Sequence, residues 1–406
     1  MTSTVDVYYD PYDAAIDADP HPVWKRLRDE APVYYNERHD FWAVSRYDDV
    51  LNALLDWETF SSARGIVVEM IDTNPDAVLL DDIPGMLPMM IMMDPPRHDR
   101  LRKLVSRAFT PRRVAALEAR MREMCAEFLD PHVGGEPFDI MEECAAKVPG
   151  MVIGAIMGVP EPDQNELRIW IDAMMRWDPD GTDTFKAESV GKLWKYMQDL
   201  VAERRDHPRD DMISDLHAAR IADADGGGDT QLTFDEVFGF TQLLIAAGNE
   251  TTARLLGWTA VLLARHPDQR RILLDDPSVV PNAVEELLRY ESPSPIQGRY
   301  VTRDVEVAGT TIPAGSRLAI LNASGNRDER HFDDPDRFDV RRQIDRHLAF
   351  GYGVHFCLGA ALARLEGRVV LEEMLARFPD WQVDESSIEL VHTSTVRGPH
   401  TLQFAP

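Results

Sequence analysis

Cys357 is one of only three cysteines among 406 residues, and it lies in the stretch FGYGVHFCLG between Phe350 and Gly359. Free cysteine is among the most buried residue types, so a structural role in the core is the simplest interpretation. Gly351 and Gly353, however, allow a tight loop whose backbone amides approach the sulfur. Because the following residues have helical spacing, Cys357 is predicted at a helix N-terminus, where the dipole and free N–H groups favour a thiolate.

A thiolate in this loop could be a nucleophile or a metal ligand. A zinc site needs three or four Cys or His ligands at characteristic spacings, but only His355 lies nearby and the sequence has no C-x-x-C motif. A cysteine protease needs a histidine base and an orienting Asn or Asp; the sequence does not exclude these, yet it lacks the known local signatures. A single thiolate in a glycine-lined loop suits the axial ligand of a haem iron.

A long helix is predicted between the capping box formed by Thr233 and Glu236 and the proline at position 267. At about 1.5 Å per residue, about 32 residues would extend roughly 48 Å and cross a whole domain. Its middle, from Gly248 to Thr252, consists of mediocre or poor helix formers. The alternative is two helices, of which the first ends at Gly248 and Asn249.

The composition and the remaining patterns bound the fold and the location. The 70 acidic residues outnumber the 43 basic ones and give a net charge of −27, which disfavours nucleic acid and anionic membranes as partners. The N-terminus has no signal-peptide pattern and the cysteines are scattered, so a cytoplasmic protein is expected. Apolar spacings of three and four predict a mainly helical chain, with small β hairpins over residues 35–45 and 305–321. We therefore expect one domain over residues 1–406.

The stretch from Phe350 to Gly359 resembles the haem-binding loop of bacterial cytochrome P450 proteins at every fixed position. The resemblance extends over roughly residues 9–404. It implies a mainly α fold with a small β region, as a single large P450-type domain whose long central helix lies over haem b (iron protoporphyrin IX). It also implies that Cys357 is the proximal thiolate ligand, that Phe350 shields the sulfur and that His355 reaches a haem propionate. The loop glycines implied at the haem are Gly351, Gly353 and Gly359.

Glu286 and Arg289 lie three residues apart and would share one helix face. Alone, such a pair is most often an exposed contact with little effect on stability. In the family that this chain resembles, a Glu-x-x-Arg pair is buried and is completed by an arginine from a Pro-x-Arg-Phe segment, which here implies Arg337. Breaking a buried pair leaves an uncompensated charge, so Arg289→Ala is predicted to lower haem retention.

The centre of the long helix matches the pattern Ala-Gly-x-Glu-Thr-Thr of the same family. There the helix opens over the haem, so that an acid and an alcohol face dioxygen. The match implies that Ala247 and Gly248 border the haem. It further implies that Thr251 makes the hydrogen bond and that Glu250 supplies protons, since a carboxylate beside a hydroxyl can relay them.

The resemblance also implies cations for the haem propionates and a substrate pocket. His98 and Arg102 match a His-x-x-x-Arg pattern, and Arg299 is similarly placed, although each alone would more often be a surface charge. A methionine run before residue 95 is most often core filling, but Met-rich surfaces also bind varied apolar ligands. The implied pocket residues are Met86, Met89, Met90, Ile296, Gln297 and Thr395.

The implied function is that of a haem-thiolate monooxygenase, an oxidoreductase that inserts one atom of O₂ into an apolar small molecule and reduces the other to water. The substrate would be a fatty acid, terpenoid, steroid or aromatic compound. Electrons are expected from NAD(P)H through a ferredoxin reductase and a ferredoxin, and we expect a monomer without nucleic-acid or membrane partners. The alternatives are a peroxygenase driven by hydrogen peroxide, which the pair Glu250 and Thr251 disfavours, and a haem protein that binds ligands without turnover. The basic residues considered for ferredoxin docking are Arg112, Arg113, Arg341, Arg342, Arg346 and Arg364.

Overall fold

The computed structural model describes residues 7–74, 76, 79–80, 87–175, 184–222, 229–391, 393 and 395–406. The helices are α1 (Ala14–Ala18), α2 (His21–Glu30), α3 (Tyr47–Leu55), α4 (Arg97–Ala108), α5 (Pro111–Ala116), α6 (Glu118–Leu129), α7 (Lys147–Met157), α8 (Glu161–Met175), α9 (Thr184–Asp206), α10 (Met212–Ala218), α11 (Phe234–Arg265), α12 (Pro267–Asp275), α13 (Val280–Tyr290), α14 (Asn322–Gly325) and α15 (Ala360–Arg377). The strands are β1 (Val33–Asn36), β2 (Phe41–Val44), β3 (Phe60–Ser61), β4 (Phe138–Asp139), β5 (Ile221–Ala222), β6 (Asp229–Thr230), β7 (Gln297–Val301), β8 (Val305–Val307), β9 (Thr310–Ile312), β10 (Arg317–Ile320), β11 (Gln382–Leu390) and β12 (Pro399–Ala405). A mainly helical fold with a small β region is thus confirmed.

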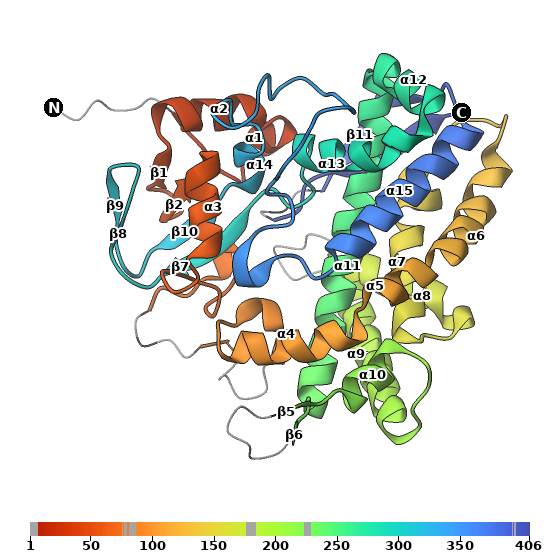
Figure 1. The fold of residues 1–406 in the computed structure, drawn as a ribbon, viewed down its shortest axis with the longest axis horizontal. Helices are drawn as coiled ribbons and strands as arrows, with labels where there is room; N and C mark the ends of the chain where they lie inside the picture. Colours follow the sequence, from red (N-terminus) through yellow and green to blue (C-terminus); the bar gives the residue numbers. More distant parts are fainter. Residues whose placement is uncertain are drawn as a thin grey trace.

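Helix α11 runs through the middle of the molecule, with the larger sheet on one side and α6 to α8 on the other (Figure 1). It begins after a capping box in which the hydroxyl of Thr233 accepts from the amide of Glu236, and the Glu236 carboxylate accepts from the amide of Thr233. It continues over 32 residues without a break, so the long helix is confirmed and the two-helix alternative is wrong. Contacts with α7, α9, α13 and α15 surround it. Tertiary packing therefore outweighs the poor helix propensity of its centre.

The larger sheet has the strand order β1-β2-β10-β7-β3. β1 pairs antiparallel with β2, and β10 pairs parallel with β2 and antiparallel with β7. β8 and β9 form a separate two-stranded hairpin, so both hairpins expected from the sequence are confirmed. The sheet matters for the site because β7 carries Gln297 and Arg299.

The main apolar core lies on the helical side, and smaller clusters lie beside the sheet. Helix α15 begins at Ala360, three residues after Cys357, so the helix predicted behind Cys357 is confirmed. It packs against α6, α11 and α13 (Figure 1). Within the part of the chain that the structure describes, no helix has the length and apolarity needed to cross a membrane.

Candidate active site

A cavity of about 260 Å³ lies between α4, α11, β7 and the loop that precedes α15. Cys357 lines this cavity. The residues that were predicted from the sequence to contact the haem propionates also line this cavity, although they lie far apart in the chain. These are His98 and Arg102 from α4, Arg299 from β7 and His355 from the loop.

Two glycines shape the loop around Cys357. Gly351 and Gly353 have φ values of +64° and +72°, in the left-handed region that favours glycine. A Cβ at Gly353 would lie 2.7 Å from the carbonyl oxygen of Leu54, whereas the space beside Gly351 is open. The N–H of Cys357 donates a hydrogen bond to the carbonyl of Phe350 at 2.9 Å. The tight loop predicted from the glycines is therefore confirmed.

The sulfur of Cys357 faces the first turn of α15. Burial raises the pKa of the Cys357 thiol above its ordinary value, although the N–H groups of Gly359 and Ala360 and the charge of Arg102 act in the opposite direction. The helix terminus alone therefore does not produce the thiolate that the sequence predicts. A bound metal cation would, because a coordinating thiol is deprotonated.

Two arginines on the wall of the cavity have no carboxylate partner among the described residues. Arg299 is only 5% exposed, and its Nη1 donates to the carbonyl of its neighbour Gly298 at 2.6 Å. Burial lowers the pKa of Arg299 to about 10, and the nearby charge of Asp94 opposes this shift. Arg102 Nη2 donates to the carbonyl of Phe356 at 2.8 Å. Both cations are thus held by backbone groups and keep N–H groups for another acceptor.

Two histidines lie beside these arginines on the wall of the cavity. The ring centroids of His98 and His355 lie 4.5 Å apart, and Nε2 of each ring is buried without a hydrogen-bond partner. Burial, followed by the charges of Arg299, His98 and Arg102, lowers the pKa of His355 to about 2. The two arginine cations and the two unpartnered ring nitrogens fit an anionic group such as the paired propionates of haem, beside a cysteine that fits its iron.

The distal wall is formed by the centre of α11. Ala247, Gly248 and Thr251 line the cavity, and the hydroxyl of Thr251 donates to the carbonyl of Ala247 at 2.9 Å. Glu250 is not among the described residues that line the cavity. Its Oε1 instead accepts from Arg254, at 2.9 Å from Nε and 2.5 Å from Nη2. Of the predicted acid and alcohol, only the alcohol faces the cavity.

Glu366 is an acid that does line the cavity, and sequence reasoning missed it. It lies on α15, is 1% exposed, and its Oε1 has no partner. Burial raises the pKa of Glu366 to about 8, although a hydrogen bond from Thr252 opposes the shift. The group is therefore largely protonated at neutral pH. One signal was available, because Glu366 falls within the apolar face that Leu362 and Val369 define.

Glu286 and Arg289 form a fully buried ion pair, as the resemblance implied. The Glu286 carboxylate accepts from Arg289 Nε at 2.6 Å and Nη2 at 2.8 Å, and from the amide of Asp339 at 3.0 Å. The prediction that Arg337 completes this pair is wrong, because its side chain is 62% exposed and reaches Asp339 instead. The second arginine is Arg342, whose Nε lies 3.2 Å from Glu286 Oε1. Arg337 contributes only its carbonyl, which accepts from Arg342 at 2.8 Å.

The predicted pocket residues fall in different places. Met90 and Gln297 line the cavity, and Gln297 Nε2 donates to Ser294 Oγ at 2.8 Å. Ser294 Oγ in turn donates to the carbonyl of Thr395 at 3.0 Å, so Thr395 supports the wall from behind. Ile296 packs in an apolar cluster beside the sheet, because successive residues of an extended segment point to opposite sides.

The remaining methionines add little to the described wall. Met89 is partly exposed and is not among the described residues that line the cavity. Met86 lies outside the residues that the structure describes. The apolar part of the wall comes mainly from α11 and the segment before α4, and it includes Ile91, Phe240, Leu243 and Leu244.

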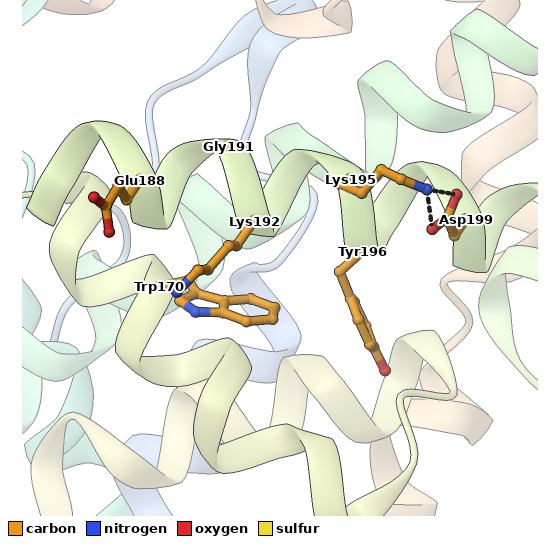
Figure 2. A pocket seen from close by; sticks show the side chains of 7 residues that line it. All are labelled: Trp170, Glu188, Gly191, Lys192, Lys195, Tyr196 and Asp199. Carbon is orange, nitrogen blue, oxygen red and sulfur yellow. Dashed lines mark hydrogen bonds and ion pairs between the residues drawn. The ribbon is translucent and has the colours of Figure 1, made fainter.

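A second hollow lies between the outer faces of α8 and α9. Figure 2 shows Trp170 from α8 and Tyr196 from α9 pointing into it, with ring centroids 5.9 Å apart. On its rim, Lys195 already pairs with Asp199 one turn away at 2.5 Å. This open hollow lacks the buried, unpartnered polar groups of the Cys357 cavity, which is therefore the candidate active site.

The comparisons with known proteins agree with this geometry. The family model described as "Cytochrome P450" matches residues 44–276 and 274–404. A relative named "Putative cytochrome P450 123" of Mycobacterium tuberculosis is 41% identical over 96% of this chain and 94% of its own length. "Vitamin D(3) 25-hydroxylase" of Pseudonocardia autotrophica is 38% identical over 98% of this chain and 96% of its own length.

A solved structure shows the same fold. Cytochrome P450 CYP109Q5 from Chondromyces apiculatus has a TM-score of 0.87 and 38% sequence identity, and the match covers 98% of this chain and 97% of that chain. The family and the relatives show a haem cofactor, and the side chains around the Cys357 cavity fit such a group. The chain belongs to the cytochrome P450 family and is a haem-dependent monooxygenase.

Proposed function

We propose that the protein oxidises an apolar small molecule with O₂ and two electrons that reach it from NAD(P)H through a ferredoxin reductase and a ferredoxin. One observation carries the proposal: Cys357, Arg102 and Arg299 meet in one enclosed cavity whose far wall is apolar and carries Thr251. When bound, the haem iron activates dioxygen, so that one oxygen atom enters a C–H bond and the other leaves as water.

The residues on the proximal side hold and orient the cofactor. Cys357 would ligate the iron, and His98, Arg102, Arg299 and His355 would bind the propionates. Phe350 is the first residue of the loop that holds Cys357, and the guanidinium of Arg364 lies 4.6 Å from its ring. The same arginine binds Glu285 at 2.7 Å, which fixes the aromatic side of the loop.

The residues of the distal wall would manage protons and water. Thr251 would hold the hydrogen bond at the reacting centre, and Glu250 would supply protons from the next position along α11. Glu366, neutral and within hydrogen-bond reach of Thr252, offers a second carboxylic acid at the same wall. A relay through a hydroxyl and a carboxyl group accounts for the use of O₂ rather than hydrogen peroxide as the oxidant.

An apolar substrate is supported by the wall that Met90, Phe240 and Leu244 share. Gln297 adds one polar group that could orient a ligand. The relative named vitamin D(3) 25-hydroxylase, and a solved relative in complex with testosterone that is 32% identical, are consistent with a bulky apolar molecule. Fatty acids, terpenoids, steroids and aromatic compounds all remain within this class.

The electron partner is proposed to dock near the proximal loop. Of the arginines considered, Arg342 is occupied by Glu286, Arg364 by Glu285 and Arg113 by Asp215. The arginines left exposed, without an ion pair to any described carboxylate, are Arg112, Arg341 and Arg346. An acidic ferredoxin would be attracted to these cations, so the reduction rate should fall as salt increases.

We also propose a monomeric, cytoplasmic protein in which residues 1–406 form one domain. The test of function uses purified protein with a surrogate ferredoxin and its reductase. Apolar compounds are first screened for displacement of the haem-bound water, and the binders are then incubated with NAD(P)H and ¹⁸O₂. The expected product carries one ¹⁸O atom per molecule. Turnover that requires hydrogen peroxide and does not depend on NAD(P)H would instead support a peroxygenase.

A further inference from the structure

Glu250 is held by a residue of its own helix. Arg254 lies one turn further along α11 and points both Nε and Nη2 at a single carboxylate oxygen, Glu250 Oε1. Both side chains are almost fully buried, at 7% and 6% exposure. At these depths a guanidinium fixes a carboxylate far more firmly than an exposed pair would.

The two oxygens of Glu250 are not equivalent. Oε1 receives both bonds from Arg254, whereas Oε2 accepts no hydrogen bond from any described residue. Oε2 is also absent from the fully buried polar atoms that lack a partner, so part of its surface is exposed. One oxygen is anchored, and the other has no partner among the described residues.

Arg254 is itself fixed from outside α11. Its Nη1 donates to the carbonyl of Pro399 at the start of β12. Its aliphatic stem lies against Gly398, where an added Cβ would come within 2.6 Å of Arg254 Cβ. The neighbouring Trp258 donates from Nε1 to the carbonyl of Arg397 at 3.3 Å. The backbone from 397 to 399 thus forms a slot that sets the direction of the guanidinium.

We propose that Arg254 is a positioning residue of the monooxygenase, which holds Glu250 by Oε1 so that Oε2 takes up protons from water and delivers them towards the cavity. The inference rests on the proposed proton role of Glu250. In each transfer an O–H bond of a hydronium ion breaks and one forms at Oε2, which leaves neutral water. The Oε2–H bond then breaks as the proton leaves towards Thr251. The carboxylate returns to its starting charge, and no oxidant or reductant is consumed in this step.

The test needs no identified substrate, because it follows the consumption of O₂ that NAD(P)H and the redox partners drive in the absence of substrate. Reduction to hydrogen peroxide uses two electrons and two protons per O₂, and reduction to water uses four of each. The ratio of NAD(P)H to O₂ consumed therefore reports proton delivery. It is measured for Arg254→Gln and Arg254→Lys, each with Glu250 intact and with Glu250→Gln. Arg265→Gln is the matched control, since Arg265 pairs with Glu385 at the exposed end of the same helix.

With Glu250 intact, Arg254→Gln should lower the share of O₂ that becomes water about tenfold, because misplacing the acid removes part of the roughly 10²–10⁴-fold that general acid–base catalysis contributes. Arg254→Lys should recover part of it, and Arg265→Gln should leave it unchanged. In the Glu250→Gln background, Arg254→Gln should have no further effect. An equal loss in both backgrounds, no loss in either, or a wild-type ratio that already corresponds to peroxide alone would overturn the proposal.

A second readout does not depend on turnover. The thermal unfolding midpoints of wild type, Arg254→Gln, Glu250→Gln and the double variant form a cycle, in which Arg254→Gln should lower the midpoint much less when Glu250 is already Gln. Gly398→Ala keeps the charge but crowds the slot, and it should lower the water share in the same direction as Arg254→Gln. A failure of the proposed function would appear differently, as a wild-type protein that consumes no O₂ with NAD(P)H and its redox partners.

Discussion

The buried pair around Glu286 and the cationic wall around Arg299 are both desolvated charge clusters, yet they differ in how complete they are. Glu286 is bonded by Arg289, Arg342 and one backbone amide. Around Arg299, two ring nitrogens stay unpartnered and no described carboxylate bonds the arginines. The polypeptide completes the first cluster by itself, and the second one requires an anion from outside.

This difference separates stability from cofactor binding. Removing a partner from the complete cluster leaves a buried charge alone and should destabilise the protein with or without haem. Removing a cation from the incomplete cluster relieves the repulsion between neighbouring positive charges in the haem-free protein. The same change should weaken haem binding, because a propionate loses its partner. The two regions should therefore respond in opposite ways to the loss of one arginine.

The largest expected effect is that of Arg289→Ala. It strips two hydrogen bonds from Glu286 and should lower the free energy of unfolding by about 3–5 kcal/mol, together with haem retention. Denaturant unfolding of the haem-loaded protein measures the change. The control is Arg337→Ala, which removes an exposed side chain and should change the free energy by less than about 0.5 kcal/mol. Equal losses in the two variants would show that Arg337 does belong to the buried cluster.

An intermediate effect is expected at Glu366, a buried acid of α15 that lines the same cavity as the incomplete cluster. Its pKa is raised to about 8, so the native state binds a proton that the unfolded chain loses near its ordinary pKa of 4.5. Stability from this neutral group is complete below about pH 4.5 and is lost as the pH rises towards 8. Between pH 5 and 8, Glu366→Gln should thus gain on the order of 3 kcal/mol relative to wild type. The control Glu306→Gln changes an exposed side chain and should gain no stability relative to wild type over this pH range. If the free energy of unfolding of Glu366→Gln changed with pH in parallel with that of wild type, a buried neutral acid would be excluded.

A smaller effect is predicted for Arg299→Leu. Loss of a charge-assisted bond to a propionate should weaken haem binding by about 2 kcal/mol, or roughly thirtyfold. The haem-free variant should unfold at the same or a higher temperature than wild type, because a buried cation without a partner is gone. Arg303→Leu, four residues on and 62% exposed, is the control that should change neither value. A haem-free Arg299→Leu protein that unfolds earlier than wild type would mean that this arginine stabilises the fold instead.

The features that could be predicted from the sequence are those that one local pattern determines. The capping box, the left-handed glycines and the helix after Cys357 all depend on nearby residues. Arg337 is the arginine of the Pro-x-Arg-Phe segment and was therefore the expected partner, but only the tertiary path of the chain decides that Arg342, five residues later, turns inward. The environment of Glu250 also depends on Pro399, which lies far away in the sequence, although the i, i+4 spacing to Arg254 was visible.

The most direct test of the account is the carbon monoxide difference spectrum of the reduced, haem-loaded protein. Thiolate ligation by Cys357 predicts a main band far to the red of that of a histidine-ligated haem, and Cys357→His should lose this shift while keeping haem. A folded, haem-loaded wild-type protein without the red-shifted band would contradict the assignment of Cys357 as the iron ligand.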